Sequence, residues 1–156
     1  MVEASDQVKE NPCQAEEFSQ FDFWLGDWRV SWGEGEKGTN RVQKILGDCV
    51  IQEEFDGRPG VELIGKSLST YDVERGCWLQ TWVDNSGGYL DFNGGWQGDK
   101  MVLSRQVPGT EGDTRQRMVW FDIQPDSLTW NWERSEDGGQ SWQILWQLKY
   151  QRLDGS

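Results

Sequence analysis

The feature that most constrains the fold is a two-residue alternation of apolar and polar side chains along most of the chain. From about residue 27 onward, this alternation runs in short segments, and turn signals rich in Gly, Pro, Asp or Asn separate each segment from the next. Alternation with this period is typical of half-buried β-strands. The segments are 27–34, 39–46, 49–56, 61–72, 77–85, 88–97, 100–107, 115–124, 127–135 and 141–152.

Short strands joined by turns at regular spacing predict an antiparallel meander. Such a sheet has to protect its two edges, and closing on itself achieves this. We therefore expect an all-β fold consisting of a single antiparallel up-and-down β-barrel with about 8–10 strands. In the segments 39–46 and 100–107, apolar residues fall on both sides, so the alternation does not decide which face points inward.

A short helical plug is expected ahead of the first strand. Residues 15–23 can form one or two helical turns, which would close one end of the barrel. The aromatic residues spaced to share one face of these turns are Phe18, Phe21 and Trp24. Residues 1–12 are mostly polar and charged, so we expect a disordered leader there, followed by one barrel domain over 13–156.

Composition excludes several partners and chemistries. The net charge of −12 argues against nucleic acid and anionic membranes, because both select for clustered Lys and Arg. The sequence has no apolar run typical of a signal peptide or a membrane span, and we expect a cytoplasmic protein. It also contains no histidine, which removes Ser-His-Asp catalysis, His-ligated zinc and His-ligated haem. We expect neither a metal nor another cofactor.

The three cysteines, Cys13, Cys49 and Cys77, are odd in number and lack the spacing of a metal site. This pattern favours reduced thiols over a disulfide framework.

The chain contains eleven tryptophans, whereas ordinary composition gives about two or three in this length. Pairs at even spacing point to one side of a strand. These pairs are Trp28 with Trp32, Trp78 with Trp82, Trp130 with Trp132, and Trp142 with Trp146. Inward aromatic residues usually form a packed core. However, each indole covers about 150–250 Å² when buried, and so many rings line a wall more readily than they fill a narrow barrel. We predict a ring-lined pocket for a flat or apolar ligand.

Polar residues on the same faces would orient a ligand in that pocket. Gln80 and Asp84 share a face with Trp82, and Arg134 shares one with Trp132. Asp84 and Arg134 also lie next to turns, where a solvated strand end is the alternative interpretation. The residues expected to bind the ligand are Trp78, Gln80, Trp82, Arg117, Trp120, Trp130, Trp132, Arg134 and Trp146.

Two resemblances extend this interpretation. Gly26-Asp27-Trp28 resembles the opening of lipocalin-type barrels, and Arg152 resembles the basic residue that packs across the first-strand tryptophan there. The resemblance implies a structural cation–π pair worth about 1–2 kcal/mol. The stretch from Phe21 to Arg152 also resembles an uncharacterised bacterial family of small lipocalin-like, calycin-type barrel proteins that open with F-D-F-W-x-G-x-W. That family offers no agreed catalytic residues, and its members often have histidine where this chain has Leu79.

The segment from Ser135 to Trp142 matches the Asp-box pattern S-x-D-x-G-x-S/T-W, which is familiar from sialidase propellers. In that pattern the aspartate, here Asp137, caps backbone donors of a hairpin turn. A single copy indicates a hairpin and makes a propeller improbable, so we assign Asp137 a structural role.

Three functions are compatible with these features. The first is a cytosolic lipocalin-like binding protein for a small hydrophobic or aromatic molecule. The second is a small barrel enzyme, such as an isomerase, cyclase or chromophore lyase. Its candidate carboxylates are Asp84, Glu53 and Glu133, with Arg117 or Tyr71 stabilising charge. The third is a protein-docking or assembly factor that uses an exposed aromatic patch and an acidic surface. The oligomeric state, including a homodimer, is left open.

Overall fold

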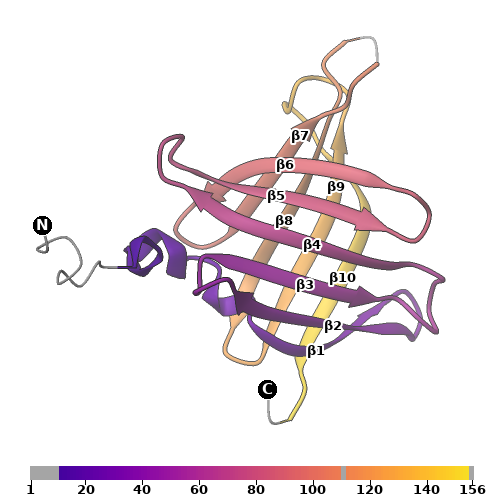
Figure 1. Cartoon of the computed structure of the whole chain (residues 1–156). Helices are drawn as coiled ribbons and strands as arrows, with labels where there is room; N and C mark the ends of the chain where they lie inside the picture. The colour runs from indigo at the N-terminus through magenta and orange to yellow at the C-terminus, as the bar shows by residue number, and fades with distance from the viewer. Residues whose placement is uncertain (1–10, 110–111, 155–156) are drawn as a thin grey trace, which may run out of the picture.

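The computed structural model describes residues 11–109 and 112–154, and within them ten antiparallel strands close into one barrel (Figure 1). Successive strands are neighbours around the barrel, as expected for an up-and-down meander. The strands are β1 (Gly26–Trp32), β2 (Glu36–Ile45), β3 (Val50–Asp56), β4 (Ile64–Asp72), β5 (Cys77–Asp84), β6 (Tyr89–Trp96), β7 (Met101–Gln106), β8 (Arg115–Gln124), β9 (Ser127–Ser135) and β10 (Gln143–Arg152). The all-β barrel predicted from the alternation is confirmed.

The barrel closes where its first and last strands meet. β1 pairs with β10 in a register that runs from Trp28 opposite Arg152 to Ser31 opposite Lys149. Because this ladder joins the two ends of the meander, it removes the free edges that an open sheet would leave.

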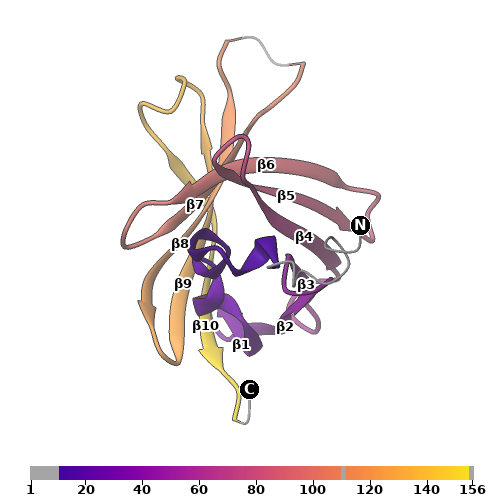
Figure 2. The ribbon, with the colours of Figure 1, turned by 60° about the vertical axis from the view of Figure 1, so that its left-hand side comes forward.

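The N-terminal plug consists of three short 3₁₀ helices. They are η1 (Pro12–Gln14), η2 (Glu16–Ser19) and η3 (Asp22–Trp24). Figure 2 shows them lying across one opening of the barrel. The leader expected over 1–12 lies outside the described residues as far as residue 10, and Pro12 already belongs to η1.

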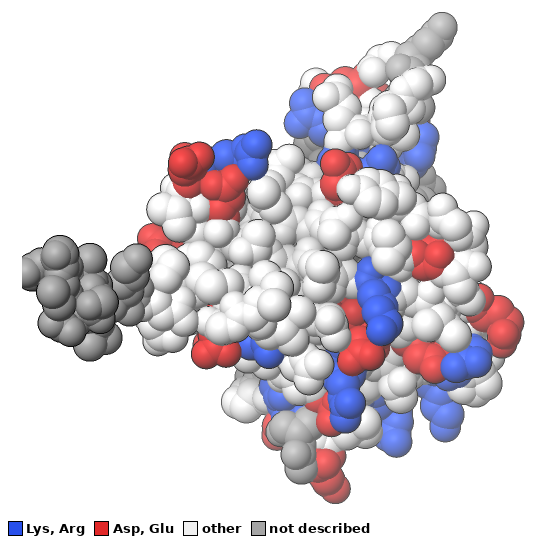
Figure 3. Space-filling model, viewed as in Figure 1, with Lys and Arg blue, Asp and Glu red and all other residues white. Residues whose placement is uncertain are grey.

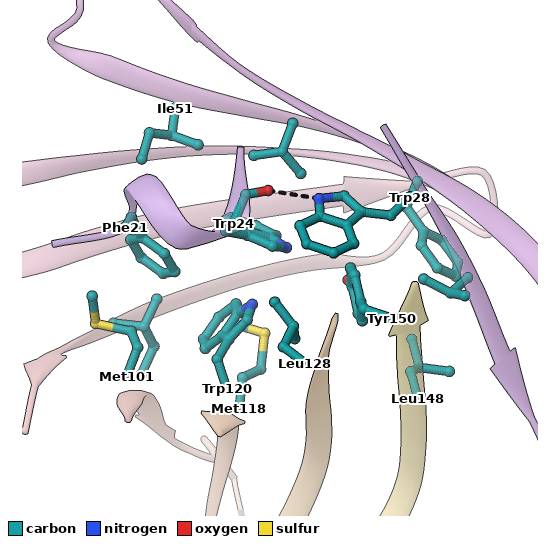
Figure 4. Packing of buried hydrophobic residues seen from close by; sticks show 14 of the residues in the cluster. Phe21, Trp24, Trp28, Ile51, Met101, Met118, Trp120, Leu128, Leu148 and Tyr150 are labelled. Atoms are coloured by element: carbon teal, nitrogen blue, oxygen red, sulfur yellow. Dashed lines mark hydrogen bonds between the residues drawn. The ribbon is translucent and has the colours of Figure 1, made fainter. Parts of the chain in front are cut away.

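Aromatic side chains pack together with aliphatic and methionine side chains in the core at the plug end of the barrel (Figure 4). The ring of Phe21 packs edge-on against Trp78 and Trp120, with ring centroids 5.0 Å apart in both cases. Trp24 packs against Trp120 at 5.2 Å, and its carbonyl oxygen accepts a 2.8 Å hydrogen bond from the Trp28 indole nitrogen. These aromatic residues are buried, so this half of the interior is packed core.

The inward faces of the two ambiguous strands are now defined. On β2, Asn40 and Val42 are buried and face inward, while on β7 Met101 and Leu103 do so. The alternation in 39–46 was ambiguous because Ile45, at the end of β2, has the opposite parity to the inward Val42.

The expectation of reduced thiols is wrong for two of the cysteines. Cys13 in η1 and Cys49, beside the start of β3, form a disulfide, and their Cα atoms lie 5.0 Å apart. Cys77 is free. The two bonded residues are 36 positions apart in the chain. Their proximity arises only when the plug folds against the β2–β3 turn, which cysteine spacing does not reveal. The disulfide therefore ties the plug to the barrel wall.

The outer surface shows few charges over the face formed by β4, β5 and β6, while acidic and basic side chains gather mostly around its edges (Figure 3). Exposed apolar residues on these strands include Leu68, Val83 and Tyr89. In the described part of the chain, no helix is long and apolar enough to cross a membrane.

Candidate functional site

A cavity of about 200 Å³ lies inside the barrel, toward the end opposite the plug. Its wall is formed by inward residues of β3, β5, β6, β8, β9 and β10, together with Leu63 from the β3–β4 loop. The lining residues are Glu53, Phe55, Leu63, Trp82, Asp84, Leu90, Phe92, Met118, Trp120, Trp130, Trp132, Trp146, Leu148 and Tyr150. The interior thus has two parts: a packed aromatic core next to the plug, and an aromatic-walled cavity toward the opposite end of the barrel.

Trp146 of β10 holds one side of the cavity together. Its ring meets Trp32 at a centroid distance of 5.1 Å, Phe55 at 6.0 Å and Trp130 at 6.0 Å, all edge-on. Edge-to-face contacts of this kind add about 0.5–1.5 kcal/mol per pair beyond the burial of apolar area. Because such contacts fix the ring orientations, the indoles form a defined wall.

Glycine makes room for another part of the wall. Gly65 on β4 faces the cavity side, where a Cβ atom would lie 2.2 Å from two ring carbons of Trp82. The absence of a side chain therefore lets the Trp82 indole lie against the β4 backbone. The indole nitrogen of Trp82 also donates a 2.8 Å hydrogen bond to Asp84.

Glu53 is the most deeply buried charged group in the lining. Its two carboxyl oxygens accept hydrogen bonds from the Ser67 hydroxyl at 2.7 Å and from the Asn40 amide at 2.8 Å. The same Asn40 amide nitrogen donates to the Tyr150 hydroxyl at 2.8 Å. Burial raises the pKa of the Glu53 carboxyl above its ordinary value, and the two hydrogen bonds offset this only in part. Burial also raises the pKa of Tyr150.

Asp84 is the second carboxyl group of the lining, and it has the opposite electrostatic character. It accepts hydrogen bonds from the Ser86 hydroxyl and backbone, from the Trp82 indole and from the Gly88 backbone. These donors, led by the Ser86 hydroxyl, lower the pKa of Asp84 to about 2. Asp84 is therefore ionised at neutral pH. It both caps the β5–β6 turn and lines the cavity.

Five of the tryptophans expected to contact a ligand line this cavity: Trp82, Trp120, Trp130, Trp132 and Trp146. Trp78 does not, because it lies at the plug end, where its indole nitrogen donates to the Gln20 side chain. Gln80 does not either, since its buried amide is bonded to Ser69.

The two arginines expected to orient a ligand also lie away from the cavity lining. Arg117 forms an ion pair with Glu133 at 2.6 Å, and its guanidinium carbon sits 3.9 Å from the centroid of the Trp142 ring. This cluster is on the outer wall, because Arg117 has the opposite parity to the inward residues Met118 and Trp120. The contacts of Arg117 hold the β9–β10 loop against β8. Because Glu133 belongs to this outer cluster, it is not one of the carboxylates of the cavity.

Arg134 has the parity of the cavity tryptophans but lies at the end of β9. Its guanidinium bonds to Glu136 at 2.6 Å. Arg134 therefore occupies a strand end, which was the alternative to a ligand-binding position. Among the described residues, no lysine or arginine lines the cavity.

The three residues expected to have structural roles make contacts that suit those roles. The guanidinium carbon of Arg152 lies 4.1 Å from the centroid of the Trp28 ring, and one guanidinium nitrogen donates to the Leu25 carbonyl at 2.6 Å. Asp137 accepts hydrogen bonds from the Gln140 backbone and from the Ser141 backbone and hydroxyl. These bonds, led by the Ser141 hydroxyl, lower the pKa of Asp137 to about 2.

Several lining residues were missed at the sequence level. Phe55, Met118, Leu148 and Tyr150 all line the cavity. Leu148 and Tyr150 share the parity of Trp146, which was a usable signal. By contrast, no signal in the sequence indicated the hydrogen bonds of Asn40 and Ser67 to Glu53, because these bonds join three different strands.

The described residues contain no group of three or more His, Cys, Asp or Glu side chains that could hold a metal ion. Comparison of the chain with models of known protein families and with curated proteins found no match.

Proposed function

We propose that this protein is a lipocalin-like binding protein for a small hydrophobic or aromatic molecule. The observation that carries the proposal is the aromatic-walled cavity of about 200 Å³ at the end of the barrel opposite the plug. An eight-stranded barrel is just wide enough for its own side chains or one small ligand, and the diameter grows with the number of strands. The aromatic-walled cavity of this ten-stranded barrel therefore supports a role as a receptor for a small ligand.

The size of the cavity sets the size of the ligand. An apolar cavity of about 150 Å³ admits benzene, so a volume of about 200 Å³ suits a molecule with one or two rings. The tryptophan and phenylalanine faces would supply dispersion and stacking contacts to such a ligand.

The disulfide bears on where the protein works. Disulfides persist in oxidising compartments and are rare in the cytosol. The Cys13–Cys49 bond therefore weighs against the cytoplasmic location expected from the sequence and favours an oxidising one.

A second candidate function is catalysis, which the environment of Glu53 favours. A buried carboxyl group with a raised pKa can act as a general acid or base on a bound molecule. If the protein is such an enzyme, a bound ligand will be converted, and Glu53→Gln will remove the conversion while binding persists. A carrier will release its ligand chemically unchanged.

The binding proposal can be tested with naphthalene, an uncharged probe of suitable size, using titration calorimetry of the purified protein. Leu63 lines the cavity, so Leu63→Trp should narrow it and weaken binding at least about tenfold. Leu68→Trp is the matched control, because Leu68 is exposed on the outer face of β4. The control should bind like the unaltered protein. Equal binding by both variants, or no binding by the unaltered protein, would contradict the proposal.

A further inference from the structure

The polar groups of the cavity are acidic and rich in hydrogen-bond acceptors. Glu53 and Asp84 are the two charged residues of the lining, and no lysine or arginine from the described residues joins them there. Every hydrogen bond recorded to either carboxyl group comes from a neutral donor. Neither group is therefore neutralised by a cation of the protein within this site.

The cluster around Glu53 also has more acceptors than donors. Each Glu53 oxygen receives one hydrogen bond, although a carboxylate can accept about four in total. Asn40, which contacts Glu53 from outside the cavity lining, has a buried side-chain carbonyl oxygen without a hydrogen-bond partner in the described residues. In the lining itself, one buried donor, the indole nitrogen of Trp120, also has no partner there. A ligand with N–H donors would supply what this cluster lacks.

The aromatic wall points to the same kind of ligand. A cation is attracted to the faces of aromatic rings, most strongly to tryptophan. Trp82, Trp130, Trp132 and Trp146 surround the cavity, and two carboxyl groups lie in the same wall, of which Asp84 is ionised. A cavity of this composition disfavours anions, because it combines ring faces with the ionised Asp84, and none of the described lining residues is a lysine or arginine.

We infer that the ligand of this cavity is a small aromatic amine bound as its ammonium ion, with Glu53 and Asp84 as the groups that complement its charge. This inference rests on the proposed binding function and specifies the chemical class of the ligand. The ring of the ligand occupies the tryptophan-walled space, and its ammonium group supplies donors to the acceptor-rich side. The two arginines that the sequence predicts to orient a polar group of the ligand, Arg117 and Arg134, are not among the lining residues of this cavity.

Three probes of similar shape that differ in charge test the inference: 2-phenylethylammonium, propylbenzene and 3-phenylpropionate. Each is titrated into the purified full-length protein at pH 7.5 by calorimetry. We expect the ammonium probe to bind at least about tenfold more tightly than propylbenzene, and the carboxylate probe to bind most weakly. If propylbenzene or 3-phenylpropionate binds as tightly as the ammonium probe, the charge inference fails and the binding proposal stands. If none of the three binds, both fail.

Charge-removing variants locate the effect. A bound ammonium group favours the ionised form of Glu53, so Glu53→Gln should reduce the preference for the ammonium probe and leave propylbenzene affinity unchanged. Glu54→Gln is the matched control, because the neighbouring Glu54 lies on the outer face, where it pairs with Lys66 at 3.6 Å. It should keep the full preference. Asp84→Asn gives an independent test if Glu53→Gln does not fold, and it should also reduce the preference. An unchanged preference in the folded variants would overturn the inference.

Discussion

Removing the disulfide should destabilise the protein by an amount that follows from the loop it closes. Cys13 and Cys49 are separated by 36 positions. In the chain-entropy model, a cross-link over a loop of this length restricts the unfolded chain by about 13 cal/mol/K, or about 4 kcal/mol at 25 °C. We therefore expect Cys13→Ala with Cys49→Ala to lower the free energy of unfolding by about 3–4 kcal/mol. For a chain of 156 residues, this corresponds to a fall in Tm of about 6–16 °C.

The assay is urea unfolding followed by tryptophan fluorescence, performed on the unaltered protein, the double variant and the reduced unaltered protein. Reduction removes the same cross-link without changing a side chain, so both forms should lose a similar amount of stability. Cys77→Ala is the matched control, because Cys77 is free. If neither reduction nor the double substitution changes stability by more than about 1 kcal/mol, the disulfide does not restrain the fold as described. An equal loss of stability in the Cys77→Ala control would also contradict this account of the disulfide.

Three further changes test separate parts of the structure. Gly65→Ala would place a methyl group against the ring of Trp82. It should therefore lower stability by about 1–3 kcal/mol and weaken probe binding. Gly95→Ala is the control, because a Cβ atom there meets open space, and it should change neither property. Burial raises the pKa of Glu53, so the native state holds its proton more strongly and stability falls as pH rises from about 4.5 through the raised value. Glu53→Gln should flatten this part of the stability profile between pH 4 and 8, and a parallel profile would refute the assignment. Arg152→Met should lower stability by about 1–3 kcal/mol in urea unfolding, because it loses the contact with the first-strand indole and the hydrogen bonds to backbone carbonyls; an unchanged midpoint would argue against this closure.

The barrel could be predicted from the sequence because each strand has one face against the interior. This arrangement produces a period of two in the chain, as in β3, where the buried Ile51, Glu53 and Phe55 alternate with less buried residues such as Gln52 and Glu54. Turn residues then mark the ends of the strands. Local chemistry of this kind determines an antiparallel meander almost completely, since each strand pairs with its neighbour in sequence.

The candidate site was predicted less well because burial does not always mean an inward position. Arg117 and Trp120 are three residues apart on β8 and therefore face opposite sides, yet the outer side of β8 and β9 also carries buried polar residues such as Asn131 and Glu133. Conversely, Arg134 has inward parity but lies at the strand end, where Glu136 is in reach. Parity identified the ring-bearing strands, but it did not reveal how far along the barrel each residue lies.

Contacts between distant segments had no signal in the sequence. The hydrogen bonds of Glu53 depend on the register of β3 with β2 and β4, which places Asn40 opposite Phe55 and Ser67 opposite Glu53. The disulfide likewise depends on the position of the plug. Such contacts follow from closure of the barrel and are absent from any local pattern.

The most direct test of the central claim is a nuclear magnetic resonance titration of the indole N–H groups in ¹⁵N-labelled protein with naphthalene. The eleven tryptophans provide reporters throughout the barrel, and single Trp→Phe variants assign their signals. Binding in the cavity should shift the signals of Trp82, Trp130, Trp132 and Trp146, while those of Trp28 and Trp78 at the plug end stay in place. Shifts confined to the plug end or to the outer-wall Trp142, or no shifts at all, would show that the aromatic cavity is not a binding site.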